Sequence, residues 1–309
     1  MQGQSTKLID YRERYGQWVI DQQVYSAIGS TVYKAHHHIN VDDIAALKII
    51  PAEPPDFAQS DPGDQTARRI TNELEALQMV DHPNIVRLRD FGRDTESYWL
   101  AMQWVAGGTL AHRLDGLSQR RLHPMYACAY TIQIALALQA IHNQHLIHRD
   151  VKPSNILIDG DDPDHLYLAD FGIVRSDYGT RVTADGKIIG TAEYMAPEQA
   201  RNDPQTGRTD LYALGCVLFE MLSGRPPYCD AKPMVVASQQ ALAAVRDVRQ
   251  FAPHIPDSLA NIVHTLLAKD PDDRYPTGGA LAWKLAPFLE GSTQTAWLNR
   301  VTGQLASLA

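Results

Sequence analysis

Residues 148–155 read His148-Arg149-Asp150-Val151-Lys152-Pro153-Ser154-Asn155, and Asp170-Phe171-Gly172 follows farther along the chain. The two segments bring carboxylate, amide and amine side chains close together in the sequence. Taken singly, each residue has an ordinary structural explanation, since an Asp in a loop commonly forms a turn or caps a helix. The fold is therefore decided by several such segments in a fixed order rather than by one residue.

Length and charge set the first limits. The chain has 309 residues, of which 44% are apolar, so it can bury enough core for about two domains. Lys and Arg number 28 against 36 Asp and Glu, and the net charge of -8 argues against a broad basic surface for nucleic acid or anionic lipid. The three cysteines, Cys128, Cys216 and Cys229, are far apart, which predicts free thiols in a reducing compartment.

Neither a membrane span nor a signal sequence is expected. The longest strongly apolar stretches, 134–138 and 211–222, are shorter than the ~20 residues that a span requires. Residues 1–14 lack an apolar signal core. We therefore expect a cytoplasmic protein with no nucleic-acid partner and no membrane span in this chain.

Hydrophobic patterning predicts a strand-rich first third and a helical remainder. Two strands around a turn are expected over 18–34, and further strands over 44–50, 85–88 and 98–105. A Pro-rich connector at 51–63 precedes a helix over 67–80, whose apolar positions are Ile70, Leu74, Leu77 and Met79. Buried helices are expected over 124–141 and 210–223, and a short docked helix over 292–309. This order is typical of an α+β protein with two lobes.

The segments at 148–155 and 170–172 resemble the catalytic loop and the metal-binding motif of the eukaryotic-like (Hanks-type) serine/threonine protein kinases. The resemblance extends in order over about residues 15–290. It includes Met195-Ala196-Pro197-Glu198, with Arg274 matching the arginine that pairs with this glutamate. Lys152 and Thr191 resemble the serine/threonine rather than the tyrosine subfamily. The stretches 190–200 and 268–271 are most similar to bacterial members.

The resemblance implies a two-lobed protein-kinase-like fold. Residues 15–102 would form an N-lobe with a small antiparallel sheet and one main helix, and 108–290 a larger, mostly helical C-lobe. A hinge at 103–107 would join them. Residues 1–14 would be an N-terminal extension and 291–309 a C-terminal tail.

The implied activity is transfer of the ATP γ-phosphate, with Mg²⁺, to Ser or Thr hydroxyls of proteins. Asp150 would accept or orient the substrate hydroxyl, while Asn155 and Asp170 would supply the oxygen ligands that Mg²⁺ prefers. Lys48, on the third strand, would anchor the phosphates and pair with Glu73. The implied catalytic residues are Asp150, Lys48, Lys152, Glu73 and Thr191.

The implied nucleotide-binding residues are Ala27, Val32, Ala46, Lys48, Met102, Gln103, Val105 and Leu157. Met102 stands at the gatekeeper position, and the main chain of 103–105 would bind adenine. Val32, Ala46 and Leu157 would enclose the base, although ordinary core packing is an alternative interpretation of these three. A small-molecule kinase of related fold is a further alternative, but such kinases lack the peptide-positioning segment.

The phosphate-covering loop departs from the family pattern. Tyr25, Ala27 and Ser30 stand at its three glycine positions, and only Gly29 is nearby. Glycine permits close backbone approach and positive φ, so this loop is expected to be stiffer or displaced. The alternative function is therefore a pseudokinase that binds nucleotide or acts as a scaffold.

Regulation by phosphorylation is also implied. Arg149 beside Asp150 resembles kinases whose activation segment is ordered by a phosphate, because the guanidinium requires an anion. The expected acceptors are Thr183 first and Thr180 second. The expected partners are ATP, Ser/Thr protein substrates and a second copy of the chain for trans-autophosphorylation.

Residues 36–38 are three consecutive histidines. A solvated turn is favoured over a metal site for them, because neighbouring strand residues alternate faces and cannot readily converge on one ion.

Overall fold

The computed structural model describes residues 13–27, 29–51, 63–94, 96–170, 181–182, 188–189, 192–289 and 303. Contacts within the chain divide it into two compact units. The first contains Met1–Gln78 and Val86–Val105, and the second contains Met79–Ile85 and Ala106–Ala309. Each unit has its own buried core.

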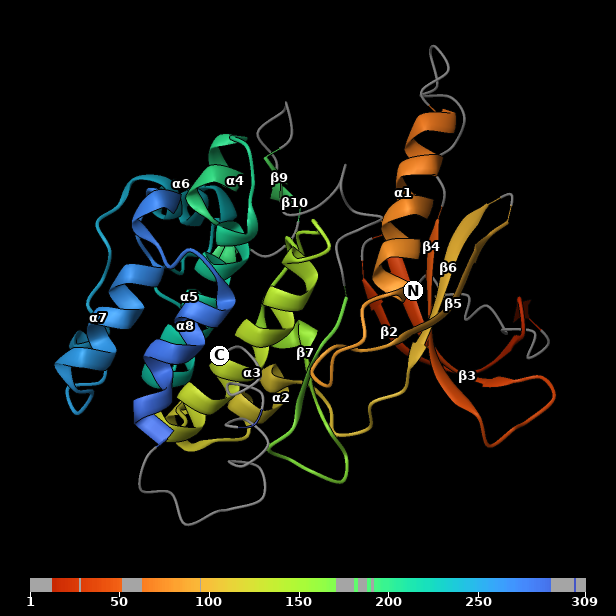
Figure 1. The fold of residues 1–309 in the computed structure, drawn as a ribbon, viewed down its shortest axis with the longest axis horizontal. Coiled ribbons are helices and arrows are strands. Elements are labelled where there is room, and N and C mark those ends of the chain that lie inside the picture. The colour runs from red at the N-terminus through yellow and green to blue at the C-terminus, as the bar shows by residue number, and fades with distance from the viewer. Residues whose placement is uncertain are drawn as a thin grey trace, which may run out of the picture. The chain divides into compact units, whose positions relative to one another are not determined.

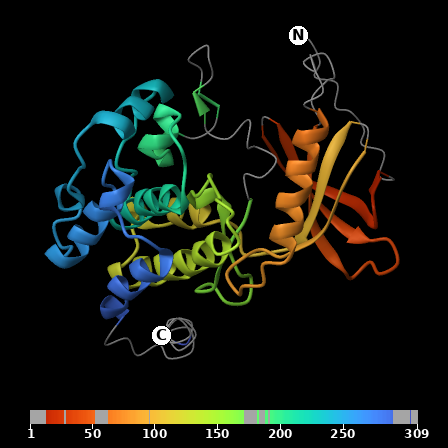
Figure 2. The ribbon, with the colours of Figure 1, turned by 45° about the horizontal axis from the view of Figure 1, so that its top comes forward.

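The first unit is built on a six-stranded sheet in the order β1-β2-β3-β4-β6-β5, with every neighbouring pair antiparallel (Figure 1). The strands are β1 (Arg14–Tyr15), β2 (Trp18–Ala27), β3 (Ser30–His37), β4 (Ile44–Pro51), β5 (Leu88–Arg93) and β6 (Ser97–Gln103). The helix α1 (Gly63–Gln78) lies alongside this sheet in both Figure 1 and Figure 2. A small antiparallel sheet with one main helix is thus confirmed.

Side-chain alternation gives this sheet one buried face. Ile20, Ala35 and Ala45 lie opposite one another across β2, β3 and β4. Leu47 on β4 lies opposite Ala101 on β6, and all five side chains are buried. Successive strand residues point to opposite faces, so the intervening positions are directed away from this core.

Three predictions in the first unit are wrong. The strand expected at 85–88 lies at Leu88–Arg93, where most side chains are polar and pairing with β6 determines the strand. The helix begins earlier than predicted and ends at Gln78, which leaves Met79 80% exposed instead of on the apolar face. His36 and His37 belong to β3 rather than to a turn, and His36 Nδ1 lies 2.6 Å from Asp21 Oδ1 on β2.

The second unit is mostly helical. Its helices are α2 (Leu110–Asp115), α3 (Pro124–His142), α4 (Pro197–Arg201), α5 (Gly207–Ser223), α6 (Pro233–Leu242), α7 (Asp257–Leu266) and α8 (Gly278–Leu285). Two short antiparallel pairs of strands accompany the helices. β7 (Ile156–Ile158) pairs with β8 (Leu166–Leu168), and β9 (Arg181–Val182) pairs with β10 (Ile188–Ile189). The predicted buried helices at 124–141 and 210–223 are confirmed as α3 and α5. Of the predicted tail helix, only Gly303 is among the described residues.

The helix α3 forms the centre of this unit. Among the described helices it is the one long and apolar enough to cross a membrane, judged by length and composition, and 72% of this apolar stretch is buried inside the protein. α8 packs against it. A Cβ at Gly278 would lie 2.0 Å from the Ala135 carbonyl oxygen, so a glycine is required at this contact.

Candidate active site

One buried carboxylate of α5 holds the loop that contains Asp150. Asp210 accepts hydrogen bonds from His148 N at 2.9 Å and Arg149 N at 2.8 Å, and His142 Nε2 lies 2.7 Å away. Arg149 has a φ of 66°, which non-glycine residues adopt rarely, and these bonds offset part of its cost. Burial raises the pKa of Asp210, but the hydrogen bond and charge of His142 outweigh it, so this pKa lies below its usual value.

His148 links the same loop to the strand before Asp170. Its Nδ1 accepts from Asp150 N at 3.3 Å, and its Nε2 lies 3.0 Å from the Ala169 carbonyl oxygen. Because burial lowers the pKa of His148, a neutral ring with its proton on Nε2 satisfies both contacts. Ala169 N donates to Asn155 O at 2.9 Å. Asp170 therefore follows a backbone segment that is tied directly to Asn155.

Asp150 is the centre of a polar cluster in the second unit. Lys152 Nζ donates to Asp150 Oδ1 at 3.0 Å and to Oδ2 at 2.8 Å. Asn155 Nδ2 donates to Asp150 O at 2.8 Å and to Oδ2 at 3.0 Å. A buried carboxylate held by two donors has a fixed orientation, and its further lone-pair positions can accept a hydroxyl proton.

The predicted metal ligands Asn155 and Asp170 fit Mg²⁺. Because Asn155 Nδ2 is directed at Asp150, its Oδ1 is the amide atom suited to a cation. Within the described part of the chain, no three His, Cys, Asp or Glu side chains are grouped so that they could hold a metal ion. An amide oxygen and a carboxylate nevertheless suffice for Mg²⁺, which takes its remaining ligands from water and substrate phosphates.

Four predicted nucleotide-site residues share one face of the sheet in the first unit. Val32 lies opposite Lys48, and Ala46 lies opposite Met102. Ala46 and Lys48 alternate with the buried Leu47 on β4, so they point away from the core face. The register thus gathers a buried lysine and small or apolar side chains on one surface, a combination that suits a nucleotide.

The other described candidates occupy separate positions. Glu73 lies half-buried on α1, and Val105 lies half-buried after β6. Gln103 N donates to Arg87 O at 2.9 Å, which fixes the start of the predicted hinge. Leu157 is half-buried and pairs with Tyr167. Thr180, Thr183 and Thr191 lie outside the described residues, and their roles stay predictions, as does the pairing of Lys48 with Glu73.

The β2–β3 hairpin forms despite the missing glycines. Ala27, which ends β2, lies opposite Ser30 at the start of β3. Gly29 has a φ of 84°, and a Cβ there would meet nothing within 4 Å. Gly29 is therefore needed for its backbone conformation and not for space. Among the described residues of this turn, it is the one with a positive φ.

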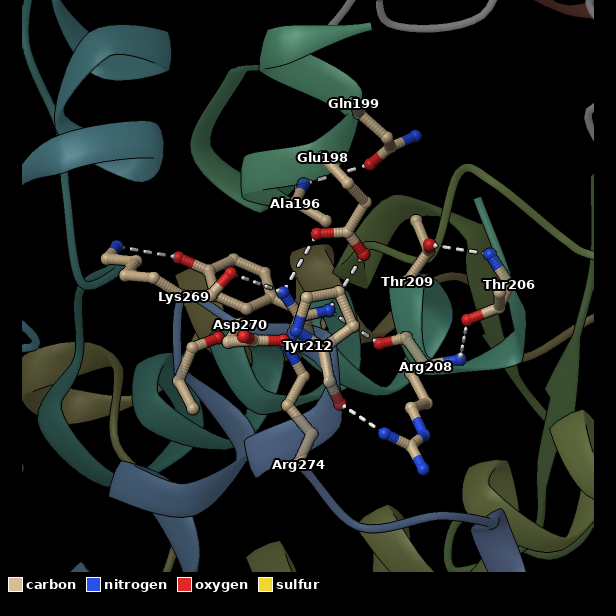
Figure 3. Close-up of polar contacts among 12 residues, drawn as sticks. Ala196, Glu198, Gln199, Thr206, Arg208, Thr209, Tyr212, Lys269, Asp270 and Arg274 are labelled. Atoms are coloured by element: carbon tan, nitrogen blue, oxygen red, sulfur yellow. Dashed lines mark hydrogen bonds and ion pairs between the residues drawn. The ribbon is translucent and has the colours of Figure 1, made fainter. Parts of the chain in front are cut away.

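The predicted pairing of Glu198 with Arg274 is confirmed (Figure 3). Arg274 Nη1 and Nη2 each donate to one oxygen of Glu198 at 2.8 Å, and both side chains are buried. Arg274 Nε also donates to Ala268 O at 2.9 Å. Burial raises the pKa of Glu198, but the hydrogen bonds and charge of Arg274 outweigh it and lower this pKa. The pair fixes the start of α4 to the segment before α8.

Sequence reasoning missed two polar residues that support the loop around Asp150. His142 lies against Asp210, which is 68 positions away in the chain. Gln199 accepts from Ala196 N at 2.9 Å and donates to Arg149 O at 3.2 Å, across 50 positions. Neither side chain has a distinguishing local pattern, so only an alignment of relatives could have indicated them.

Comparison with known proteins identifies the class. The family described as "Protein kinase domain" matches residues 24–284. Among solved structures, Rad53 in complex with AMP-PNP aligns with a TM-score of 0.70 and 28% identity, covering 88% of this chain and 65% of that one. The kinase domain of PknI from Mycobacterium tuberculosis gives a TM-score of 0.69 at 24% identity, covering 91% and 98% of the two chains, which supports the fold alone. The chain therefore belongs to the protein kinase family.

The curated relatives narrow this to bacterial serine/threonine kinases of the Hanks type. PrkC from Bacillus subtilis is 34% identical over 259 residues, covering 82% of this chain and 38% of the relative. PknH from Mycobacterium tuberculosis is 36% identical over 252 residues, covering 81% and 38%. PknE from the same species is 36% identical over 253 residues, covering 81% and 42%. The chain thus spans about two fifths of the length of these relatives.

Proposed function

We propose that this chain is an ATP- and Mg²⁺-dependent protein kinase that phosphorylates Ser and Thr hydroxyls of proteins and autophosphorylates its activation segment. The observation that carries the proposal is the cluster of Asp150, Lys152 and Asn155, with Asp170 following a segment tied to it. The pseudokinase alternative has no support from the relatives, which are named as serine/threonine kinases.

The residues of the cluster divide the work of phosphoryl transfer. Asp150 accepts a hydrogen bond from the substrate hydroxyl and takes its proton as the new O–P bond forms and the bond to ADP breaks. Lys152 and Asn155 keep the Asp150 carboxylate in one orientation. Asn155 and Asp170 would hold Mg²⁺, which when bound neutralises phosphate charge.

Intact-mass spectrometry tests this proposal. The chain is incubated with ATP and Mg²⁺, with and without dephosphorylated casein, and Lys48→Met and Asp170→Asn are measured beside it. Asp161→Asn is the matched control, because Asp161 is exposed and carries the same isosteric change. We expect phosphate additions in the unmodified chain and in the control, and about a hundredfold less or none in the two variants. Absence of transfer, together with no nucleotide-dependent thermal shift, would favour the scaffold alternative.

Phosphopeptide mapping of the same sample tests regulation and assembly. We propose Thr183 as the first acceptor and Thr180 as the second, with Arg149 contacting the phosphate. Trans-autophosphorylation between two copies predicts that the initial rate per molecule rises with protein concentration. A mapped site at Thr180 alone would contradict the order.

A cytoplasmic location is proposed from the free cysteines and acidic charge, and fractionation of the native cells tests it.

A further inference from the structure

A buried glutamine of α6 holds the turn that follows Thr191. Gln240 is 0% exposed, and its Nε2 donates to the carbonyl oxygens of Glu193 at 2.6 Å and Ala192 at 3.4 Å. These residues form the 3₁₀ helix η4 (Ala192–Tyr194). One side-chain amide therefore connects α6 to the backbone that follows Thr191, one of the residues predicted to be catalytic.

The direction of this hydrogen bond is set by two other side chains. Tyr212 Oη donates to Gln240 Oε1 at 2.5 Å, and Lys269 Nζ donates to Tyr212 Oη at 3.2 Å (Figure 3 shows the Lys269–Tyr212 contact). An ammonium group has no lone pair, so Tyr212 must accept from Lys269 and give its own proton to Gln240. With Oε1 occupied in this way, Nε2 must face the two carbonyl oxygens.

The two remaining N–H groups of Lys269 also have acceptors, so the donor and the acceptor of each hydrogen bond in the cluster are determined. Lys269 Nζ donates to Gln240 O at 2.7 Å and to Tyr228 Oη at 3.3 Å. Tyr228 in turn donates to Ala244 O at 2.6 Å, just beyond the end of α6. Three ammonium protons thus meet three acceptors, and both tyrosine hydroxyl protons have fixed destinations.

We infer that Gln240 is a positioning residue for the protein substrate, and that Lys269, acting through Tyr212, keeps the Gln240 amide in the orientation that holds residues 192–194. The inference rests on the proposed kinase function, because it requires a bound protein substrate. Gln240 does not touch the reacting atoms. Its loss should therefore change binding of the protein substrate more than binding of ATP.

The charge of Lys269 makes this arrangement dependent on pH. Burial lowers its pKa to about 8, and the cationic neighbours Arg274 and Arg201 add to that effect. A negatively charged Cys216 thiolate would raise the pKa of Lys269. Burial raises the pKa of this thiol to about 12, however, so Cys216 is neutral near pH 8. The other titratable groups facing Lys269 are Tyr212 and Tyr228, whose pKa values burial also raises. In the described part of the chain, Lys269 Nζ hydrogen-bonds to two phenol oxygens and one carbonyl oxygen.

Below about pH 8 the Lys269 ammonium only donates hydrogen bonds, whereas above it the neutral amine can also accept a hydrogen bond from the Tyr212 hydroxyl. Tyr212 is then free to turn its proton toward Lys269 instead of Gln240 Oε1, so the orientation of the Gln240 amide is no longer fixed by a single donor direction. We therefore expect the KM for the protein substrate to rise between pH 7 and pH 9 while the KM for ATP stays nearly constant. Lys269→Arg keeps a donor-only cation and should flatten this dependence.

The first measurement compares Gln240→Met, Tyr212→Phe and the unmodified chain, with dephosphorylated casein as acceptor. Gln239→Met is the matched control, because it makes the same change on the adjacent, only half-buried position of α6. At pH 7 we expect Gln240→Met to raise the KM for casein about threefold to tenfold, with the KM for ATP within about twofold. Tyr212→Phe should raise the casein KM in the same way and remove its pH dependence. Equal effects on both KM values would overturn the inference.

The second measurement does not depend on activity. Hydrogen exchange of the peptide covering 192–196 is followed without nucleotide, together with a peptide from α3 as an internal reference for folding. Gln240→Met should speed exchange at 192–196 and leave α3 unchanged, whereas unchanged exchange at 192–196 would overturn the positioning role. If the unmodified chain transfers no phosphate, the proposed function fails, and the exchange result still decides whether Gln240 holds the turn. If Tyr212→Phe behaves as the unmodified chain in both measurements, the orienting role of Lys269 is refuted.

Discussion

Replacing Arg274 by Met should destabilise the second unit strongly, because it leaves the Glu198 carboxylate buried without its partner. The guanidinium makes two 2.8 Å bonds to that carboxylate, and the two side chains are 0% and 2% exposed. Breaking a buried pair by removing one member costs about 3–5 kcal/mol. For a domain of this size, each kcal/mol shifts Tm by about 2–4 °C, so we expect Arg274→Met to lower Tm by about 6–20 °C.

The pH dependence gives this prediction a second, independent signature. Arg274 lowers the pKa of Glu198, so the pair stabilises the fold above the unfolded pKa of about 4.3, and this contribution is lost as pH falls through the lower folded value. In Arg274→Met, both effects of Arg274 that lower the pKa of Glu198 are lost. Burial then raises this pKa against only the hydrogen bonds from Thr209 and the Glu198 backbone, so the acid becomes neutral at a higher pH than in the unmodified chain. The Tm difference between the two proteins should therefore shrink as pH falls from 7 toward 4.

Thermal unfolding followed by circular dichroism tests both statements. Asp272→Asn serves as the control, since Asp272 is 91% exposed and its ion pair with Arg208 should contribute less than about 1 kcal/mol. The double variant Glu198→Gln with Arg274→Met should recover part of the lost stability, because no buried charge remains. A Tm decrease below about 3 °C, or a difference that does not change between pH 7 and pH 4, would refute the reasoning.

Two further substitutions act on other contacts of the second unit. Asp210→Asn should lower the free energy of unfolding by about 1–3 kcal/mol, because an amide cannot accept hydrogen bonds from His148 N, Arg149 N and His142 together. The midpoint of urea unfolding measures this loss, and an unchanged midpoint would contradict it. The folded pKa of Asp210 is lowered, so its contribution is present above about pH 4 and lost as pH falls further. Gly278→Ala should cost about 1–3 kcal/mol by pushing α8 from α3, whereas Gly116→Ala, whose Cβ would meet nothing closer than 3.6 Å, should be neutral within about 0.5 kcal/mol in the same assay.

The sequence predicted those parts of the molecule that local pattern determines. The β-forming residues of 18–34 and the apolar run at 44–50 indicated the sheet, and apolar patterns indicated α3 and α5. The strand at Leu88–Arg93 was placed too early, because half of its residues are charged and pairing with β6 determines the strand. Where partner strands rather than periodicity determine an element, a single sequence lacks the needed information.

The site shows the same limit. Motif resemblance indicated Asp150, Asn155 and Asp170 because each carries chemistry at a fixed spacing from the others. It could not indicate Gln240, whose partner Tyr212 is 28 positions away. A polar residue inside an apolar helix pattern reveals neither its burial nor its partner, and both follow only from the fold.

The polar side chains of α5 show why a fully buried helix is not uniformly apolar. Asp210 holds the backbone around Asp150, and Tyr212 orients Gln240. Glu220 accepts from Tyr194 at 2.5 Å and so holds the end of η4. Apolar residues of equal volume at these positions would pack as well, and buried polar pairs add little net stability, so packing alone does not account for them. Each instead fixes one neighbouring segment in a single arrangement through directed hydrogen bonds. Loss of any one should therefore disorder its own segment before it unfolds the helix.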